Sequence, residues 1–443
     1  MPTWELKCPH CGGPNAVAAD RSCLACRFCG AGLWVRLPSD HTTLVAPARL
    51  KKQEAVFAWD RHLKESDQPL SRSPRDTRLL FLPFWRISAI VAIRESAESK
   101  VEQEEDQWGT FDSEGYVPAP KRDTSRDATD VLLGNWSIKP WETTTPAFAG
   151  GLACLDSLGM RAETAPLTGW DRVVLSDESV CCRPVLEAAD ALRRLEPAIA
   201  SVLGMGKRVI EEQRIIAPRL TLIYWPVWQM AERRGEDSSA AEVDAVSGRI
   251  ISTLSGPLPE VDAAGDSPGH APVLVPHRCL TCGADLPVDD RYVVFVCGNC
   301  RKLTAHSENG SRLVVGADYT IPESRGDQQW YPFWSFNQGR TLVPAFGIRS
   351  YRHRLRLGVI MSGAVREVTR PDEPPRHLAG VAVGPEVAAG LARIILERGQ
   401  VVPETTTPDT EPRLVYAPMK TVGRELVDPV TGLCIAGNVI SAF

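Results

Sequence analysis

The sequence of 443 residues has no apolar run long enough to cross a membrane. Its longest apolar stretch, residues 79–93, is too short and is interrupted by Pro83 and Arg86. A charged-then-apolar leader is also missing, because the first residues lead directly to Cys8, and we expect no signal peptide. These absences predict a cytoplasmic protein without a transmembrane segment.

Positive charge is not in excess either. Fifty Lys and Arg stand against 55 Asp and Glu, which gives a net charge of −5 and disfavours a protein whose main task is to grip phosphate backbones. Acidic residues are concentrated between Glu95 and Glu114, where Lys100 is the only base. We predict a solvated acidic insert near residues 95–128.

Catalytic motifs are missing or out of context. No H-E-x-x-H string occurs. Residues 265–269 read G-x-S-x-G, but they lie in a Pro/Gly-rich linker, and Pro268 removes an amide hydrogen that an oxyanion hole would need. Residues 204–208 lack the spacing and the Ser or Thr of a phosphate-binding loop. We therefore predict that the protein is not an enzyme and has no small-molecule substrate.

Cysteine, in contrast, is abundant, and eight of the 13 cysteines form two sets with the same spacing. Each set reads C-x2-C-x14-C-x2-C, which lets two C-x2-C knuckles close a tetrahedron of thiolates around one Zn²⁺. Four sulfurs leave no open position, so we expect two structural zinc ions per chain. The predicted ligands are Cys8, Cys11, Cys26, Cys29, Cys279, Cys282, Cys297 and Cys300.

Glycine follows the second cysteine in three of the four knuckles, where a tight turn favours a residue that can adopt positive φ. The fourth knuckle has Arg301 in this place. With these knuckles, residues 4–36 and 275–305 resemble the zinc ribbons of the transcription factor IIB and rubredoxin-like type. The resemblance implies a metal-stabilised fold and transfers no catalytic residue.

The remaining cysteines leave alternatives open. Cys23 forms a further C-x2-C pair with Cys26 and could replace a ligand or indicate an iron–sulfur cluster, but the second set has Val294 in the equivalent place. We therefore leave Cys23 out of the metal site. We expect Cys181 and Cys182 to be buried apolar thiols, with a vicinal redox pair as the alternative. Cys154 and Cys434 are also expected to be buried.

Three other landmarks recur in the same order: residues 82–85 as 331–334, 222–227 as 414–419, and 243–248 as 427–432. Their order predicts a strand-rich α+β protein, built as a tandem repeat of a four-cysteine zinc ribbon followed by a small mixed sheet with a helix. This arrangement resembles a group of uncharacterised bacterial tandem zinc-ribbon proteins. The expected parts are a ribbon at 1–37, an α+β domain at 38–265, a linker and second ribbon at 266–305, and an α+β domain at 306–443.

The local patterns predict helices and strands around these landmarks. Pro at a first helical turn favours helices over 184–195 and 385–397, and a third helix is expected over 51–64. The Pro-containing apolar segments 81–85, 223–228 and 330–336 are expected to be short strands at a sheet edge or bulge. In the 243–248 landmark, we expect Asp244 to cap its own turn, with Gly248 at positive φ.

Arginine alternates with other residues in the segment 351–357. A strand here would place Arg352, Arg354 and Arg356 on one face, which we predict to bind an acidic protein surface or nucleic acid. The alternative is a solvated face that is neutralised by the acidic insert.

The sequence favours a non-catalytic, zinc-stabilised scaffold or adaptor subunit of a larger cytoplasmic protein assembly. The alternative is a nucleic-acid-associated or regulatory zinc-ribbon protein, and an enzyme with unrecognised residues comes third.

Overall fold

The structure is a computed structural model. It describes residues 3–18, 21–37, 42–67, 76–95, 111–112, 115–116, 136–151, 153, 155–158, 166–169, 179–203, 210–234, 237–256, 258–263, 272–306, 312–320, 328–362, 367–371, 374–397, 411–423, 425–429 and 434–440. The predicted acidic insert lies almost entirely outside these ranges, as do the G-x-S-x-G segment, residues 204–208 and Cys154.

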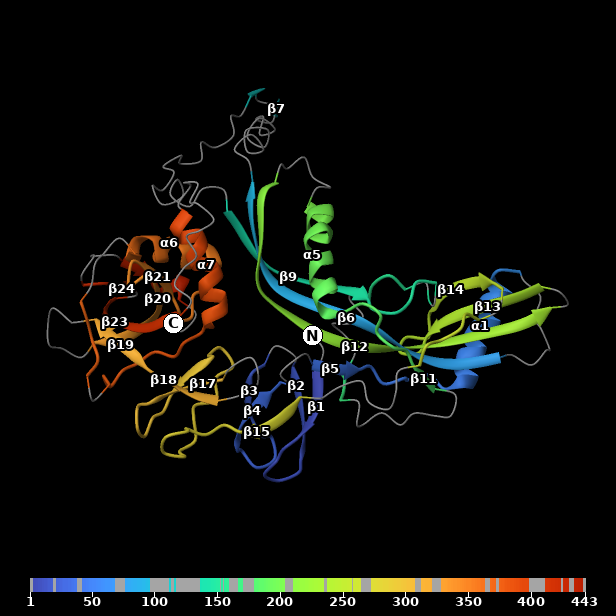
Figure 1. Ribbon diagram of the computed structural model, residues 1–443, viewed down its shortest axis with the longest axis horizontal. Coiled ribbons are helices and arrows are strands. Elements are labelled where there is room, and N and C mark those ends of the chain that lie inside the picture. The colour runs from blue at the N-terminus through green and yellow to red at the C-terminus, as the bar shows by residue number, and fades with distance from the viewer. Residues whose placement is uncertain are drawn as a thin grey trace.

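Two seven-stranded sheets form the body of the protein (Figure 1). The first has the order β11-β6-β12-β13-β14, with β5 beside β12 and β9 beside β6. Its strands are β5 (Thr42–Val45), β6 (Asp76–Glu95), β9 (Trp136–Pro146), β11 (Ser179–Cys181), β12 (Ile210–Arg234), β13 (Asp237–Asp244) and β14 (Ile250–Ser255).

The second sheet has the order β21-β20-β23-β19-β22, and β24 and β25 extend it beside β23. Its strands are β19 (Ala317–Thr320), β20 (Gln329–Phe336), β21 (Thr341–Pro344), β22 (Val368–Thr369), β23 (Arg413–Val422), β24 (Glu425–Val427) and β25 (Cys434–Ala436).

Smaller sheets of two or three strands hold the cysteine-rich segments and one short hairpin. They contain β1 (Thr3–Lys7), β2 (Pro14–Ala18), β3 (Cys23–Ala25), β4 (Gly32–Arg36), β7 (Phe111–Asp112), β8 (Gly115–Tyr116), β10 (Pro166–Leu167), β15 (Val273–Pro276), β16 (Val294–Val296), β17 (Leu303–His306) and β18 (Arg312–Val315).

The helices complete a strand-rich α+β fold. They are α1 (Lys52–Glu65), α5 (Ala188–Leu203), α6 (Tyr351–Ser362), α7 (Pro385–Glu397) and the 3-10 turn η2 (Gly437–Val439). The helix predicted over 385–397 is confirmed, α1 begins one residue later than predicted, and α5 begins four residues after Pro184. None of the helices in the described ranges has the length and apolar character needed to cross a membrane.

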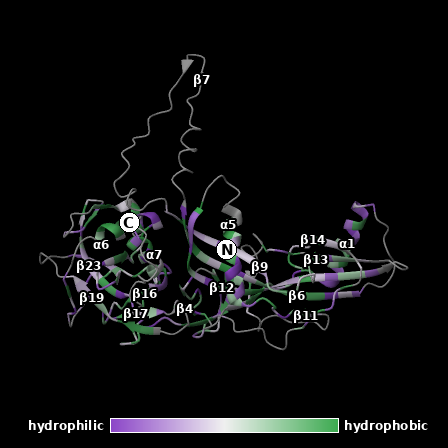
Figure 2. Ribbon diagram, turned by 45° about the horizontal axis from the view of Figure 1, so that its top comes forward, coloured by the Kyte–Doolittle hydropathy of each residue, from purple (hydrophilic) through white to green (hydrophobic). Residues whose placement is uncertain are grey.

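Helix α1 shows how a mostly polar segment is held in place. Its buried residues Ala55, Trp59 and Leu63 recur every four positions and therefore share one face. Figure 2 shows that the rest of the helix is largely hydrophilic. The helix lies beside β13 and β14, at the end of the molecule farthest from α6 and α7 (Figure 1).

The prediction of short edge strands is wrong for the first sheet, because β6 and β12 are its two longest strands and pair with each other at its centre. Pro83 is tolerated because it lies where the neighbour of β6 changes. Strand β11 pairs with β6 as far as Phe81, and β9 pairs from Phe84 onward. A missing amide hydrogen at this changeover interrupts no ladder.

The two large sheets share the register of their central strand pairs. Pro83 of β6 lies opposite Tyr224 of β12, and Pro332 of β20 lies opposite Tyr416 of β23. In both sheets a third strand joins in parallel beside the tyrosine, β5 in the first and β19 in the second. The arrangement around the two landmark motifs is therefore the same.

Hydrogen bonds beside these pairs also correspond. The indole nitrogen of Trp85 donates to the carbonyl oxygen of Leu186 at 2.7 Å, and that of Trp334 donates to Val383 at 2.6 Å. Each acceptor precedes a helix, α5 in the first case and α7 in the second. Each tryptophan thus fixes the start of the helix that covers its sheet.

The predicted turn at Asp244 is confirmed. Its Oδ1 accepts backbone hydrogens from Val246 at 2.9 Å and Ser247 at 3.3 Å, and Gly248 has a φ of +75°. The carboxylate therefore caps its own turn, and this explains the residue without a catalytic role.

The prediction of an arginine-bearing strand is wrong, because the segment forms helix α6. Ser350 precedes the helix, and its hydroxyl accepts the backbone hydrogen of His353 at 3.2 Å, as an N-cap does. The buried residues Leu355, Gly358 and Val359 have the i, i+3, i+4 spacing of one helix face. Over a few residues, the sequence pattern fits both periods, and packing against the sheet selects the helix.

The first sheet reaches into the core of the second. Beyond the first core, β6 and β12 continue to α7, where Ala92 and Ile216 join the hydrophobic cluster around Leu391. Arg214 of β12 donates to both carboxylate oxygens of Glu397 at 2.6 Å. This ion pair also joins β12 to α7, beside the apolar contact of Ile216.

Gly390 marks the tightest point of this contact, since an added Cβ would lie 2.5 Å from Cγ2 of Ile216. Gly390→Ala should therefore destabilise the protein by about 1–3 kcal/mol, although alanine is the better helix former. Denaturant unfolding with and without Ile216→Ala would measure the coupling, and the double variant should lose less stability than the sum of the single losses.

Gly150→Ala is the matched control, because nothing lies within 4 Å of the added Cβ there. Additive losses in the Gly390 and Ile216 cycle, or a stabilised Gly390→Ala protein, would show that this contact does not constrain the two sheets.

Candidate metal centres

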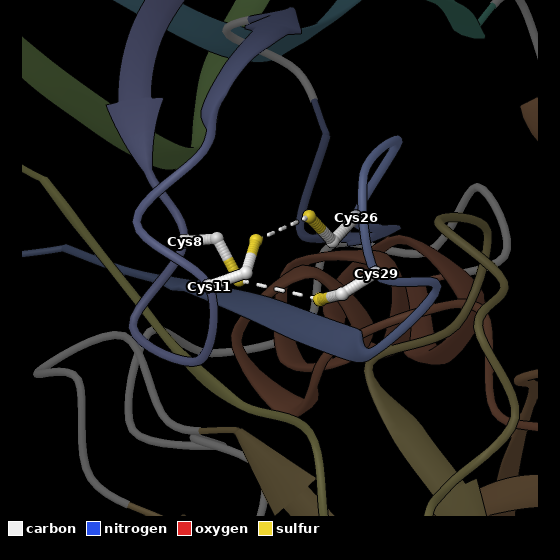
Figure 3. Close-up of side chains that lie close together, drawn as sticks. All are labelled: Cys8, Cys11, Cys26 and Cys29. Carbon is white, nitrogen blue, oxygen red and sulfur yellow. Dashed lines mark hydrogen bonds between the residues drawn. The ribbon is translucent and has the colours of Figure 1, made fainter.

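The structure brings the first four predicted ligands together. Cys8 follows β1 and Cys26 follows β3, so two short hairpins present their knuckles to each other. Figure 3 shows the four side chains pointing into one space. The sulfur of Cys8 lies 3.9 Å from that of Cys29, and the sulfur of Cys11 lies 3.7 Å from that of Cys26.

The second set of ligands is assembled in the same way. Its sulfur distances are 3.6 Å between Cys279 and Cys300 and 3.5 Å between Cys282 and Cys297. Metal–sulfur bonds of about 2.3 Å in a tetrahedron place sulfurs about 3.8 Å apart, close to both sets of distances. Each group of four cysteines can therefore hold one metal ion.

The knuckle turns explain the glycines. Gly12, Gly30 and Gly283 each have a φ of +73°, and Arg301 has +58°. In each knuckle the amide of this residue donates to the carbonyl of the first cysteine, at 2.8–3.0 Å. Arg301 thus adopts a conformation that favours glycine, and its guanidinium donates to the carbonyl of Pro374 at 3.0 Å.

Sequence reasoning missed an asparagine that supports the first group. Buried Asn15 donates to the sulfur of Cys26 at 3.6 Å, and its side-chain oxygen accepts the backbone hydrogen of Arg27 at 3.1 Å. Backbone hydrogen bonding, first from Cys29, and this side-chain contact lower the pKa of Cys26 to about 6. The available signal was a single polar residue within the otherwise apolar strand Pro14–Ala18.

The second group has a different supporting side chain. Hydrogen bonding from the backbone of Ala284, followed by the side chain of Asn299, lowers the pKa of Cys282 to about 6. Asn299 lies inside the last knuckle and is exposed, whereas Asn15 is buried. At Cys26 and Cys282, hydrogen bonds to the sulfur favour the thiolate, which is the form that binds a metal.

Cys23 stays outside the first metal group. It is 1% exposed and packs with Leu286, Phe295 and the buried ligands Cys279 and Cys297 of the other group. Burial raises its pKa to about 11, so the thiol remains protonated and behaves as a small apolar side chain.

The two cysteine-rich segments are joined to each other. Strand β15, which leads into the second segment, pairs with β4 of the first. The rings of Trp34 and His306 lie 3.9 Å apart, and His277 contacts Phe295 at 4.4 Å. The second segment therefore supplies a strand to the first and an aromatic cluster beside it.

Cys181 and Cys182 are buried, as predicted. Burial raises the pKa of each thiol to about 12, which keeps both thiols protonated at neutral pH. Cys434 is exposed, and the prediction that it is buried is wrong.

The three predicted partner-binding arginines do not share a face. Arg352 is exposed on α6 and Arg356 is half-buried, while Arg354 is 4% exposed and donates to the carbonyl of Pro344. Burial lowers the pKa of Arg354 to about 10. Only Arg352 retains the position expected of a residue that meets a partner from solvent.

Comparisons of the chain with protein-family models, with curated proteins and with solved structures found no match.

Substitution of two cysteines that lie close together in the sequence tests the assignment of the metal ligands. Cys26→Ser should lower the bound metal from two equivalents per chain to one, because one sulfur of a tetrahedral site is lost. Cys23→Ser should leave both equivalents bound, since this thiol packs outside the group. Elemental analysis of the purified proteins measures both, and loss of metal from the Cys23 variant would reassign the ligand set.

Proposed function

We propose that both cysteine groups hold structural Zn²⁺ ions. Support comes from the ligand set, since four thiolates in a tetrahedron suit zinc and leave no position for a substrate. The cysteine-rich segments consist of strands of three to five residues, which bury little surface of their own, so metal binding would supply much of their stability.

Elemental analysis of the wild-type protein should find two zinc ions per chain and no stoichiometric iron. Removing zinc with a chelator should unfold the cysteine-rich segments, detected as rapid amide exchange in 3–36 and 273–306. Iron in place of zinc, or unchanged exchange after metal removal, would contradict this assignment.

We also propose that the chain is a tandem repeat of a zinc ribbon followed by a sheet with a helix. The shared register of the central strand pairs supports this proposal, as do the two tryptophan hydrogen bonds. The last hairpins agree as well. Val243 pairs with Ile250 in the first and Val427 pairs with Cys434 in the second, so the same number of positions separates Val243 from Val427 and Ile250 from Cys434.

For the protein as a whole, we propose a non-catalytic scaffold or adaptor that binds other proteins in the cytoplasm. Strand β18 carries this proposal. It pairs with β17 on one side, and no other strand in the described ranges pairs with it. Leu313 is 44% exposed and Val314 is 52% exposed, so apolar side chains on both faces of this edge meet solvent.

Such an edge offers a partner strand both backbone hydrogen bonds and apolar contacts. Two further apolar side chains are exposed in the knuckles, Phe28 in the first ribbon and Leu280 in the second. Each is a further exposed apolar side chain that a protein partner could cover. Arg352 remains a proposed contact for an acidic partner.

Affinity purification from the native host, followed by mass spectrometry, should identify a stoichiometric protein partner. Val314→Lys should weaken its binding about tenfold, since a charge on an edge strand opposes strand addition. Phe57→Lys is the control, because Phe57 is 68% exposed on α1, far from β18.

Equal binding by the two variants would contradict a contact at β18. Tight binding of nucleic acid with a steep salt dependence, and no protein partner, would favour the alternative of a nucleic-acid-associated protein instead.

A further inference from the structure

A cavity of about 360 Å³ opens between the second ribbon and the second sheet. Tyr292 and Phe295 line it from the ribbon, and Tyr331 and Phe346 line it from the sheet. Aromatic rings thus approach the same space from two separate parts of the chain. The volume lies within the lower range of small-molecule sites.

The walls of this cavity are tied together by backbone hydrogen bonds. The amide of Val293 in the ribbon donates to the carbonyl of Val381 at 2.7 Å, and the amide of Ala379 donates to Trp330 of β20 at 2.8 Å. Gly380 lies between these two ties, and an added Cβ there would come within 2.6 Å of the Tyr292 ring. The segment 379–381 therefore fixes the ribbon against the sheet, and the cavity is preformed.

The corresponding place beside the first sheet is occupied by buried leucines. Alignment by strand register places Leu80 and Leu82 of β6 where β20 has Gln329 and Tyr331. Both leucines are fully buried in one continuous core that includes Leu24 of the first ribbon.

Beside the second sheet, Val294 and Leu303 of the ribbon share one cluster with Trp330 and Trp334 of the sheet, whereas the aromatic walls of the cavity belong to two other clusters. Phe295 belongs to the ribbon cluster, and Tyr331 and Phe346 belong to the sheet cluster. The cavity lies between them. The exposed side chain of Gln329 and the buried Tyr331 thus stand where the first sheet has two buried leucines.

The polar groups of the cavity are neutral. The hydroxyl of Tyr331 donates to the side-chain oxygen of Gln329 at 3.2 Å. Burial raises the pKa of Tyr331 to about 12, so this hydroxyl keeps its proton at neutral pH. The described residues that line the cavity include no Asp, Glu, Lys or Arg. A charged ligand would find no counter-charge here, whereas an amide could hydrogen-bond with Gln329 and Tyr331.

We propose that this cavity binds a small, uncharged, planar aromatic molecule that carries an amide-like hydrogen-bonding edge. Aromatic walls suit a flat ring system, and the neighbouring Gln329 and Tyr331 suit the polar edge. This ligand site goes beyond the adaptor function, because it does not require a protein partner.

Indole-3-carboxamide is a suitable probe, and indole-3-carboxylate is its charged match. Saturation-transfer NMR with the zinc-loaded full chain should detect saturable binding of the carboxamide. The carboxylate should bind at least about tenfold more weakly, because its charge would be desolvated without a partner.

Two variants locate the binding site. Tyr331→Phe keeps the ring and removes the hydroxyl, and Gln329→Leu supplies the residue found at the corresponding place in β6. Each should weaken carboxamide binding about tenfold, by loss of one hydrogen bond in a largely apolar site. Tyr351→Phe on α6 is the control and should bind as the wild type does. Thermal unfolding and zinc content check that each variant is folded.

No saturable binding of the carboxamide by the wild type would overturn the proposal. Equal affinity for carboxamide and carboxylate would overturn it too, as would wild-type affinity in both cavity variants.

Discussion

The antiparallel pairing of β6 with β12 is the interaction on which the rest of the structure depends. The two strands pair from the end near Glu95 to the end near Asp76. On one side of the pair, β11 and β9 pair with β6, and on the other side β5 and β13 pair with β12. Their far ends carry Ala92 and Ile216 into the core around α7. Because one strand pair serves two cores, the second sheet does not pack independently of the first.

The two cysteine groups and the landmark motifs were predictable because they depend on local geometry. A C-x2-C knuckle closes its own turn, as the four amide-to-carbonyl bonds show, so spacing alone identifies the cysteines that come together. Asn15 was missed because its contact with Cys26 joins two hairpins. The open cavity was missed for the same reason, since Phe295 and Tyr331 come from distant segments.

The errors concern features that tertiary contacts decide. Pro83 suggested an edge strand, yet the pairing at that point is set by β9 and β11, which are distant in sequence. The segment at 351–357 suggested a strand, yet the Ser350 cap and burial against the second sheet produce a helix. Helix periodicity then buries Arg354 beside Pro344, where a strand would have exposed it. A short pattern cannot choose between two periods until its neighbours are known.

The two ribbons show how similar metal-binding motifs can acquire different surroundings. The first ribbon supplies Leu24 to a core that is closed by Leu80 and Leu82. In the second ribbon, Phe295 packs with Cys23 from the first ribbon, while Val294 and Leu303 pack with Trp330 and Trp334 of the second sheet and a cavity remains beside Phe295. Because β15 pairs with β4, the two ribbons lie side by side. Apolar side chains of the second ribbon, Leu286 and Phe295, therefore pack with Cys23 of the first. The cavity beside Tyr331 lies between this cluster and the cluster that holds Tyr331 and Phe346.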